Sequence, residues 1–243
     1  MMRVPRFYEA QPLAGLAELT LSDSSFQHAG KALRLREGDR LSLFNGDGYE
    51  YDALVSTADK RSMQVSITAT RRANTESALN IEIGQALSRG ERMDYAVQKA
   101  TEMGCQTLTP LFTERCEVKL TAERQDKRQR HWQQVAISAC EQSLRNRLPE
   151  IATPQSLQTW LETCQAEVKL VLHHHSATAL TTMQPPTSVA LLIGPEGGLT
   201  EAEVAQAMEQ GFQPLAFGPR VMRTETAPVA ACAVLQYLWG DLG

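Results

Sequence analysis

The chain has 243 residues, 42% of them hydrophobic and 21% charged, with a formal net charge of −4 at pH 7. This composition is typical of a globular protein and excludes bulk disorder and low-complexity tracts. The negative total argues against a general nucleic-acid coat protein, because binding phosphates requires local positive charge.

The first 70 residues have the pattern of short strands. Residues 41–44 and 49–55 flank Asn45-Gly46-Asp47-Gly48, a strong turn signal because Asn and Gly tolerate positive φ. Residues 62–70 alternate apolar and polar side chains, which is the period of a half-buried strand. We therefore predict a small β-barrel over residues 1–72.

From residue 81 onward, predicted strands alternate with predicted helices. The strands are expected at residues 81–87, 106–112, 168–173, 189–193 and 214–217, and the helices at 90–103, 122–144, 200–210 and from Pro228 on. This alternation predicts an α/β domain with a mainly parallel sheet. Residues 71–79 are polar and unpatterned, so we place the boundary there and assign residues 73–243 to the second domain.

A metal site and a disulfide framework are not expected. The five cysteines include no CxxC pair. His173, His174 and His175 would alternate between the two faces of a strand, so they could not converge on one ion. No apolar run approaches the roughly 20 residues of a bilayer-spanning helix, and the first ten residues lack the apolar segment of a secretory signal. We therefore expect a cytoplasmic protein.

The strongest local motif is LLIGPEGGLT at residues 191–200. It predicts an apolar strand, a glycine-rich loop and a capped helix in succession. Glycines in such a loop let a ligand approach the backbone closely and expose main-chain polar groups to it. A purely structural strand-to-helix turn would need one glycine, whereas this loop has three, which favours ligand binding.

A second motif, FGPRVMRTETA at residues 217–227, has the same organisation. A predicted strand again ends in Gly-Pro, and two arginines and a glutamate fall in the loop that follows. In open α/β sheets, ligands bind outside the carboxyl ends of the strands. We therefore expect the two loops to form one pocket, and a solvated Arg/Glu loop is the alternative.

Together, the two motifs closely resemble the signature of the SPOUT class of S-adenosylmethionine-dependent RNA methyltransferases. Within that class the chain resembles the RsmE family, the 16S ribosomal RNA uridine-N3 methyltransferases. The resemblance covers essentially the whole chain. Further matching residues are 3–8, 28, 31–35, 38–39, 44–46, 88–93, 98–104, 114–116, 139–143, 145–147 and 149.

The resemblance implies more about the fold than the periodicity does. Members of such families have an N-terminal PUA-like β-barrel for RNA and a C-terminal SPOUT α/β domain whose last segment threads a trefoil knot. The resemblance also implies a homodimer, with the methyl-donor pocket beside the partner subunit. The expected partner is 16S ribosomal RNA or the small ribosomal subunit, with no role for a metal or a membrane.

The methyl donor implied by the resemblance is S-adenosylmethionine, bound in the knot largely through backbone contacts. The residues assigned to donor binding in this way are Leu172, Gly194, Glu196, Gly197, Gly198, Phe217, Gly218, Val221 and Arg223. The expected acceptor is N3 of one specific uridine in 16S ribosomal RNA.

The chemistry of uridine N3 indicates which residues are catalytic. N3 carries a weakly acidic proton, and losing it places negative charge on the flanking O2 and O4 carbonyls. An arginine near those oxygens would stabilise this charge, by roughly 3–4 kcal/mol in oxyanion-type sites. Arg223 is the first candidate and Arg89 the second. Glu196 or Glu225 is expected to accept the proton, provided that its environment raises its pKa.

A base that is methylated at N3 must be unpaired or flipped out of a helix. Basic side chains from both domains are expected to hold the surrounding phosphates. The candidates are Arg3, Arg6, Lys31, Arg34 and Arg36 in the barrel, with Arg115, Lys119 and Arg145 from the rest of the chain. Free RNA and an assembled subunit both remain open as substrates.

Two other functions fit the same sequence. One is a non-catalytic RNA-binding or ribosome-assembly protein that keeps this fold, although the intact GPEGG and RTET segments argue against it. The other is a SPOUT methyltransferase that acts on a ribose 2′-hydroxyl or on a tRNA base. The resemblance alone separates this second function from the predicted one.

Overall fold

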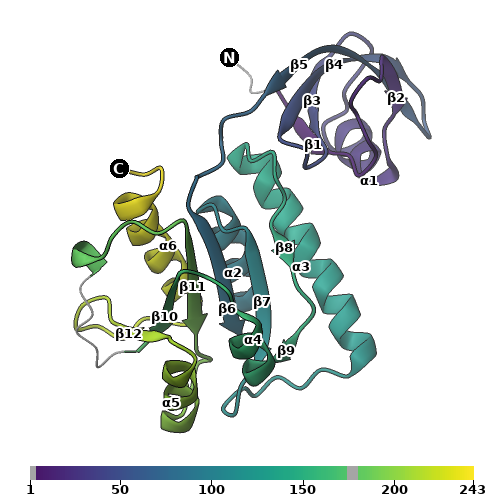
Figure 1. Ribbon diagram of the computed structural model, residues 1–243. Helices are drawn as coiled ribbons and strands as arrows, with labels where there is room; N and C mark the ends of the chain where they lie inside the picture. Colours follow the sequence, from purple (N-terminus) through teal and green to yellow (C-terminus); the bar gives the residue numbers. More distant parts are fainter. Residues whose placement is uncertain (1–3, 174–179) are drawn as a thin grey trace. The chain divides into compact units, whose positions relative to one another are not determined.

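The computed structural model describes residues 4–173 and 180–243, which form two compact units. Unit 1 comprises the chain up to Glu76 together with residues 140–148, and unit 2 comprises residues 77–139 and 149–243. Figure 1 labels the helices and strands of both. Helix α3 (Ala122–Ser143) crosses from unit 2 into unit 1, because its last turn belongs to segment 140–148.

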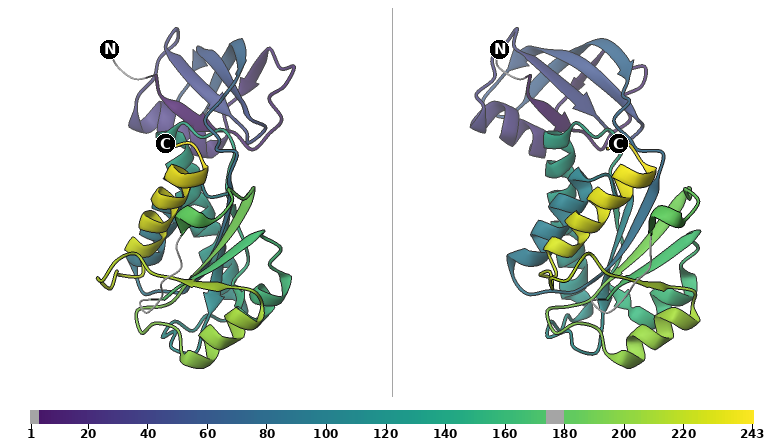
Figure 2. Two further views of the ribbon diagram at one scale, coloured as in Figure 1. Left: turned by 60° about the vertical axis from the view of Figure 1, so that its left-hand side comes forward. Right: turned by 90° about the vertical axis from the view of Figure 1, so that its left-hand side faces the viewer.

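Unit 1 is built on a five-stranded sheet with the order β1-β3-β4-β5-β2. The strands are β1 (Arg6–Tyr8), β2 (Glu18–Thr20), β3 (Arg40–Phe44), β4 (Tyr49–Ala58) and β5 (Met63–Arg72). Neighbouring strands are antiparallel except β1 and β3, which are parallel. The sheet is curved (Figure 2), and the core of the unit contains buried apolar side chains such as Phe7, Leu43 and Val65. The predicted β-rich N-terminal domain is confirmed.

The β3–β4 hairpin turns at residues 45–48, as the sequence predicts. Gly46 and Gly48 have φ angles of 93° and 89°, which glycine adopts without steric cost. The Tyr51 hydroxyl donates a hydrogen bond to Asp47 Oδ2 at 2.6 Å and anchors the turn to the strand. Burial, followed by this contact with the Asp47 carboxylate, raises the pKa of Tyr51 to about 12.

A short helical segment links β2 to β3. It begins with α1 (Asp23–Phe26), capped by Ser22, and continues as a π-helical turn over Gln27–Ala32. Phe26 and Ala29 pack into the core of unit 1. The exposed Arg34 follows with a φ of 55°, a conformation that costs strain for a residue with a Cβ atom.

Unit 2 contains a seven-stranded sheet with the order β12-β10-β11-β6-β7-β8, in which β9 also pairs with β7. The strands are β6 (Asn80–Ala86), β7 (Thr107–Phe112), β8 (Glu150–Ile151), β9 (Gln155–Ser156), β10 (Val168–Leu172), β11 (Ser188–Ile193) and β12 (Gln213–Leu215). Among the described residues, every pairing in this sheet is parallel. The predicted α/β domain with a parallel sheet is confirmed.

Helices cover both faces of this sheet (Figures 1 and 2). They are α2 (Glu91–Glu102), α3, α4 (Leu157–Thr163), α5 (Glu201–Glu209) and α6 (Thr226–Trp239), with a 3₁₀ turn at Leu180–Thr182. Leu191 packs with side chains of α2, α3 and α6, whereas Leu192 packs with those of α4 and α5. Successive residues of a strand point to opposite faces, so the buried part of β11 must be apolar on both faces, as the sequence of residues 189–193 indicates.

Because the strands are parallel, their carboxyl ends meet at one edge of the sheet. The loops after β6, β7, β11 and β12 therefore all begin at this edge. The loop after β11 ends at α5, where Thr200 and Glu203 form the capping box that the sequence predicts. The trefoil knot that the resemblance implies stays a prediction. Within the described part of the chain, no helix has both the length and the apolar character needed to span a bilayer.

Candidate active site

The loops that follow β11 and β12 line one pocket at the carboxyl edge of the sheet, as expected. The pocket has a volume of about 600 Å³. All nine residues assigned to donor binding contribute to its wall: Leu172, Gly194, Glu196, Gly197, Gly198, Phe217, Gly218, Val221 and Arg223. The structure thus brings these residues together, and their contact with a donor stays a prediction.

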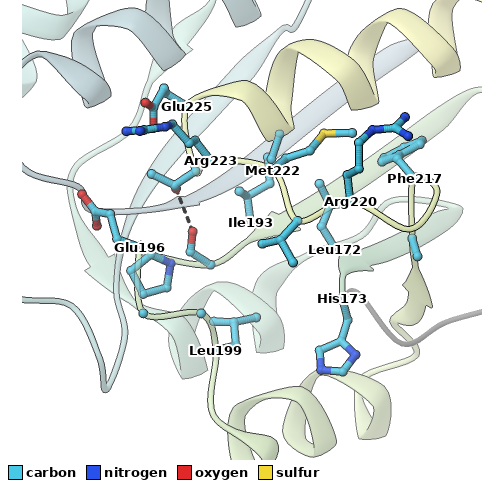
Figure 3. A pocket seen from close by; sticks show the side chains of 18 of the residues that line it. Leu172, His173, Ile193, Glu196, Leu199, Phe217, Arg220, Met222, Arg223 and Glu225 are labelled. Carbon is cyan, nitrogen blue, oxygen red and sulfur yellow. Dashed lines mark hydrogen bonds between the residues drawn. The ribbon is translucent and has the colours of Figure 1, made fainter.

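The pocket has an apolar part and a charged end. Leu172, Ile193, Leu199 and Phe217 supply apolar walls. Figure 3 shows the side chains of Glu196, Arg223 and Glu225 gathered at the end of the pocket opposite Phe217. Three of the four catalytic candidates therefore lie at one place, beside an apolar space.

The local backbone explains why two positions of the glycine-rich loop are occupied by glycine. Gly194 lies against the next turn of its own loop, where an added Cβ would come within 3.0 Å of the Leu199 nitrogen. Gly198 has a φ of +70°, and an added Cβ there would meet no atom within 4 Å. The backbone around Gly198 is therefore bare of side chains where it borders the pocket, which allows a ligand to approach it closely.

A buried hydrogen-bond chain joins the two loops. Thr224 Oγ1 donates to the Gly194 carbonyl at 2.8 Å and accepts a hydrogen bond from Gln85 Nε2 at 3.0 Å. Gln85 lies on β6, and both it and Thr224 are buried. Sequence analysis placed Thr224 within the second motif but gave it no role, and it did not identify Gln85, although a glutamine in the otherwise apolar end of β6 is a detectable signal.

The Glu196 carboxylate accepts two hydrogen bonds on Oε1. The Arg92 Nη1 donates at 2.6 Å and the Arg89 main-chain N–H donates at 3.3 Å. Burial opposes ionisation of this carboxyl, but main-chain N–H groups and the Arg92 guanidinium outweigh it, so the pKa of Glu196 lies below its ordinary value. A proton acceptor needs a raised pKa, and Glu196 does not have one. Glu196 is suited instead to accepting hydrogen bonds as an anion.

A second cavity, with a volume of about 850 Å³, adjoins the first. Arg92, Arg115, Glu196 and Gly197 line both cavities. Arg89, the second candidate for charge stabilisation, lines the second cavity and is absent from the wall described for the first. Arg89 and Arg223 therefore line different, adjoining cavities.

The predicted phosphate ligands fall into two groups. Lys31, Arg34 and Arg36 are exposed on unit 1, and Arg115 and Lys119 are exposed on unit 2, so all five are accessible to RNA. Arg3 lies outside the described residues. Arg115 also donates from Nη1 to the Gly197 carbonyl at 3.0 Å, which fixes it beside the glycine-rich loop.

Arg6 and Arg145 are buried inside unit 1, with only 7% and 3% of their surface exposed. Arg6 donates to the carbonyls of Cys140 at 2.6 Å and Arg145 at 2.8 Å, and to the Asn146 side-chain oxygen. Arg145 binds Glu76 Oε2 through Nε at 3.1 Å and Nη2 at 2.8 Å. Their guanidinium groups do not face solvent, so we withdraw both as phosphate ligands and assign them a structural role.

In the described ranges, no three His, Cys, Asp or Glu side chains are placed to hold a metal ion together. His173 lines the first pocket. His174 and His175, the other members of the histidine run, lie outside the described residues.

Comparison with known proteins relates this site to a family. The model of an RNA methyltransferase domain matches residues 75–236, and the model of an RNA methyltransferase PUA domain matches residues 21–68. The first of these matches covers most of the chain. The N-terminal match lies within the five-stranded unit, and the other spans the parallel sheet with its pocket.

Individual relatives and solved structures that match nearly the whole chain indicate the same family. Ribosomal RNA small subunit methyltransferase E of Buchnera aphidicola is 35% identical over 99% of this chain and 98% of its own length. A Legionella pneumophila methyltransferase structure with bound S-adenosylmethionine is 41% identical, with a TM-score of 0.95 over 99% of this chain and 100% of its own. The Neisseria gonorrhoeae methyltransferase E structure, also with this cofactor, is 37% identical and gives 0.93 over the same shares. The chain therefore belongs to the RsmE family of SPOUT-class RNA methyltransferases.

Proposed function

We propose that this protein methylates N3 of a specific uridine in 16S ribosomal RNA, with S-adenosylmethionine as the methyl donor. The observation that carries the proposal is the pocket at the carboxyl edge of the parallel sheet, which is lined by both signature loops. The solved relatives from L. pneumophila and N. gonorrhoeae contain bound S-adenosylmethionine, which supports the same donor here.

The residues of the pocket fit this donor. A volume of about 600 Å³ falls within the range of small-molecule sites, roughly 300–1,000 Å³. Leu172, Leu199 and Phe217 offer apolar surface to an adenine ring, and the backbone at Gly198 and Gly218 offers polar groups unobstructed by side chains. When bound, S-adenosylmethionine supplies a methyl group on a positively charged sulfur, which a nucleophile can attack.

Residues at the charged end of the pocket would stabilise negative charge on the uracil base and accept its N3 proton. During methylation, N3 loses this proton and gains the methyl group, and negative charge develops on O2 and O4 as the proton leaves. Arg223 would stabilise this charge, by about 3–4 kcal/mol in an oxyanion-type site. Glu225, at the same end of the pocket, would accept the proton and release it to water.

Recognition of the RNA would involve both units. The exposed Lys31, Arg34 and Arg36 would hold phosphates from unit 1, and Arg115 and Lys119 from unit 2. We assign RNA binding to a domain of residues 1–72 and methyl transfer to residues 73–243, with an unpaired or flipped-out target. The partner would be 16S ribosomal RNA or the small subunit, and the protein would act in the cytoplasm, in ribosome biogenesis.

The working form of the enzyme would be a homodimer with the donor pocket beside the partner subunit. Two large apolar side chains of unit 2 support an interface: Val221 at the pocket is 81% exposed, and Tyr237 on α6 is 67% exposed. In a homodimer, the partner subunit would cover one or both of these side chains. Sedimentation equilibrium tests this part, and a monomer would contradict it.

The activity is tested with labelled S-adenosylmethionine and small-subunit RNA or particles that lack the modification. Primer extension should stop at one uridine, because a methyl group on N3 blocks Watson–Crick pairing. A product modified on ribose would not stop the polymerase in the same way and would favour another SPOUT activity. Binding of RNA without binding of S-adenosylmethionine, measured by calorimetry, would favour a non-catalytic assembly protein.

A further inference from the structure

Glu203 is a buried charged residue that the proposed function leaves without a role. It lies in the first turn of α5, with only 9% of its surface exposed, and it is absent from the walls described for both cavities. Charged side chains are rarely buried unless their polar atoms have partners. The partners of this carboxylate therefore indicate why a charge is kept at this position.

The two carboxylate oxygens of Glu203 accept hydrogen bonds from two different loops. Oε2 accepts from the main-chain N–H of Thr200 at 2.8 Å, and this bond completes the capping box of α5. Oε1 accepts from the main-chain N–H of Glu114 at 2.7 Å. Glu114 lies in the loop after β7, 89 residues away in sequence. A capping box does not require this second bond, so Glu203 does more than begin a helix.

Both of these loops border the donor pocket. Thr200 directly follows residues 197–199, which line it. The loop after β7 contributes Arg115, which lines the same pocket and donates from Nη1 to the Gly197 carbonyl at 3.0 Å. Glu203 and Arg115 thus connect the same two loops, one at each end of segment 197–200.

The connection through Glu203 is the stronger of the two. Arg115 is exposed, so water competes for its hydrogen bond with Gly197. The carboxylate of Glu203 is buried, and hydrogen bonds to a charged group contribute more in such surroundings. A glutamine could not reproduce both bonds, because an amide has one acceptor oxygen and its NH₂ group would face the N–H of the other loop.

We infer that Glu203 is a positioning residue for the methyl donor: by joining Thr200 to Glu114, its carboxylate holds residues 197–199 in the geometry that binds S-adenosylmethionine. The inference rests on the proposed function, because that function assigns this pocket to the donor. Glu203 acts through the loop and takes no part in the transfer itself. Without its carboxylate, the loop would adopt the binding geometry for only part of the time, and donor affinity would fall by that fraction.

Steady-state methylation of small-subunit particles by the full-length protein gives the first test. Glu203→Gln should raise the KM for S-adenosylmethionine and its calorimetric dissociation constant about fivefold to tenfold, as expected if the loop is competent for roughly a tenth to a fifth of the time. The kcat at saturating donor should stay within about twofold of wild type, since the bound donor itself holds the loop. A damaged protein would instead show a lower kcat at an unchanged KM. That result, or an unchanged KM with an unchanged kcat, would overturn the inference.

Two further variants separate positioning from helix capping. Thr200→Ala removes the cap hydroxyl of α5 and its exposed contact with the Glu114 carboxylate at 3.3 Å, but it keeps the main-chain N–H that Glu203 binds. Ser156→Ala removes the cap of α4, which accepts from the Thr159 N–H at 3.1 Å and lies outside the wall described for either cavity. Both should lower the Tm and leave the KM for the donor near its wild-type value. If Thr200→Ala raises this KM as much as Glu203→Gln does, capping explains the effect and the inference is wrong.

Hydrogen exchange, measured by NMR, follows the two loops without catalysis. The main-chain N–H groups of Gly198 and Cys116 donate within their own loops, to the Pro195 carbonyl at 2.9 Å and the Thr113 carbonyl at 3.1 Å. In the donor-free protein, both should exchange about fivefold faster in Glu203→Gln than in wild type, because each loop has lost its connection to the other. Saturating S-adenosylhomocysteine, the demethylated donor, should remove most of the difference at Gly198. Wild-type exchange rates at both positions in the donor-free variant would contradict the inference.

The same measurements separate failure of this inference from failure of the proposed function. If wild-type protein binds S-adenosylmethionine and methylates the particles, but Glu203→Gln binds the donor equally well, the inference fails and the proposed function stands. If wild-type protein neither binds S-adenosylmethionine nor methylates RNA, the proposed function fails and the inference falls with it.

Discussion

Thr224 Oγ1 lies 2.8 Å from the main-chain oxygen of Gly194, 30 residues earlier in the chain, and donates a hydrogen bond to it. Each residue belongs to one of the two loops that line the donor pocket. Gln85 donates to the same threonine oxygen from the neighbouring strand β6. Because hydrogen bonds are stronger in buried surroundings, this chain fixes how far apart the two loops lie.

Replacing Thr224 by valine should therefore weaken donor binding. The valine removes the hydroxyl but keeps the shape, so the Gly194 carbonyl and the Gln85 amide both lose a partner, at a cost of about 1–3 kcal/mol. We expect the dissociation constant for S-adenosylmethionine, measured by calorimetry, to rise about tenfold or more. Thr224→Ser keeps the hydroxyl and should bind nearly as well as wild type. Equal affinities in the two variants would contradict this role.

Gly198→Ala should impair donor binding through the backbone it places beside the pocket. Gly198 has a φ of +70°, which strains an alanine by roughly 1 kcal/mol, and the added methyl would cover main chain that a ligand approaches. Gly211 has a φ of +87°, and its added Cβ also meets no atom within 4 Å, but it is no part of the wall described for the donor pocket. Gly211→Ala is thus a matched control for strain. Calorimetry should show weaker donor binding for Gly198→Ala alone, whereas equal losses would assign the effect to strain.

Arg223→Ala should lower kcat by about a hundredfold or more, as expected when one stabilising group is removed from an oxyanion-type site. Arg223→Lys keeps the charge but loses the planar guanidinium, so it should recover part of the activity. Arg220, at the opposite end of the same pocket, provides the comparison (Figure 3). Single-turnover methylation of small-subunit particles should show a much smaller loss for Arg220→Ala. Similar losses at both arginines would refute a specific role for Arg223.

Glu141→Gln should raise the melting temperature of the protein at pH 7. Burial raises the pKa of Glu141 and outweighs the hydrogen bond it accepts from the Tyr8 main-chain N–H at 3.0 Å. A carboxyl with a raised pKa in the folded state is penalised when ionised, so wild type loses stability as pH rises through that pKa. The glutamine removes the charge and can still accept the hydrogen bond. Its advantage should vanish at pH values below the ordinary glutamate pKa, and an advantage that is independent of pH would contradict the explanation.

The pattern of apolar and polar residues along the sequence predicted most of the helices and strands of unit 2. The apolar run at residues 189–193 corresponds to β11 (Ser188–Ile193), and the helix expected from Pro228 is α6, which begins two residues earlier at Thr226. These elements are recognisable because both faces of β11 are buried and only Thr226 and Tyr237 of α6 are exposed, which leaves a nearly continuous apolar signal. Strand β1 (Arg6–Tyr8) gave no such signal, because three residues held by a parallel partner 36 positions away have no period of their own.

In the site too, features encoded in short segments of sequence could be predicted, whereas contacts between segments far apart in sequence could not. Glycines and charged residues clustered in two short motifs identified the residues that line the donor pocket. The pairing of Thr224 with Gln85, and the burial of Arg6 and Arg145, depend on groups more than 65 residues away in sequence. An arginine is expected at the surface unless its partners are known, so the basic character of Arg6 and Arg145, together with an expected RNA substrate, assigned both to RNA binding.

The hydrogen bonds from Arg6 to the carbonyls of Cys140 and Arg145 also determine how this protein can be divided. A fragment that ends at Glu76 would keep all five strands of unit 1 but lose residues 140–148, and its Arg6 would be left without those acceptors. A fragment that begins at Ser77 would carry this segment with nothing to cover it. Domain-level experiments will therefore need fragments that join residues 1–76 to 140–148 through a designed linker, because cutting the chain once yields neither half intact.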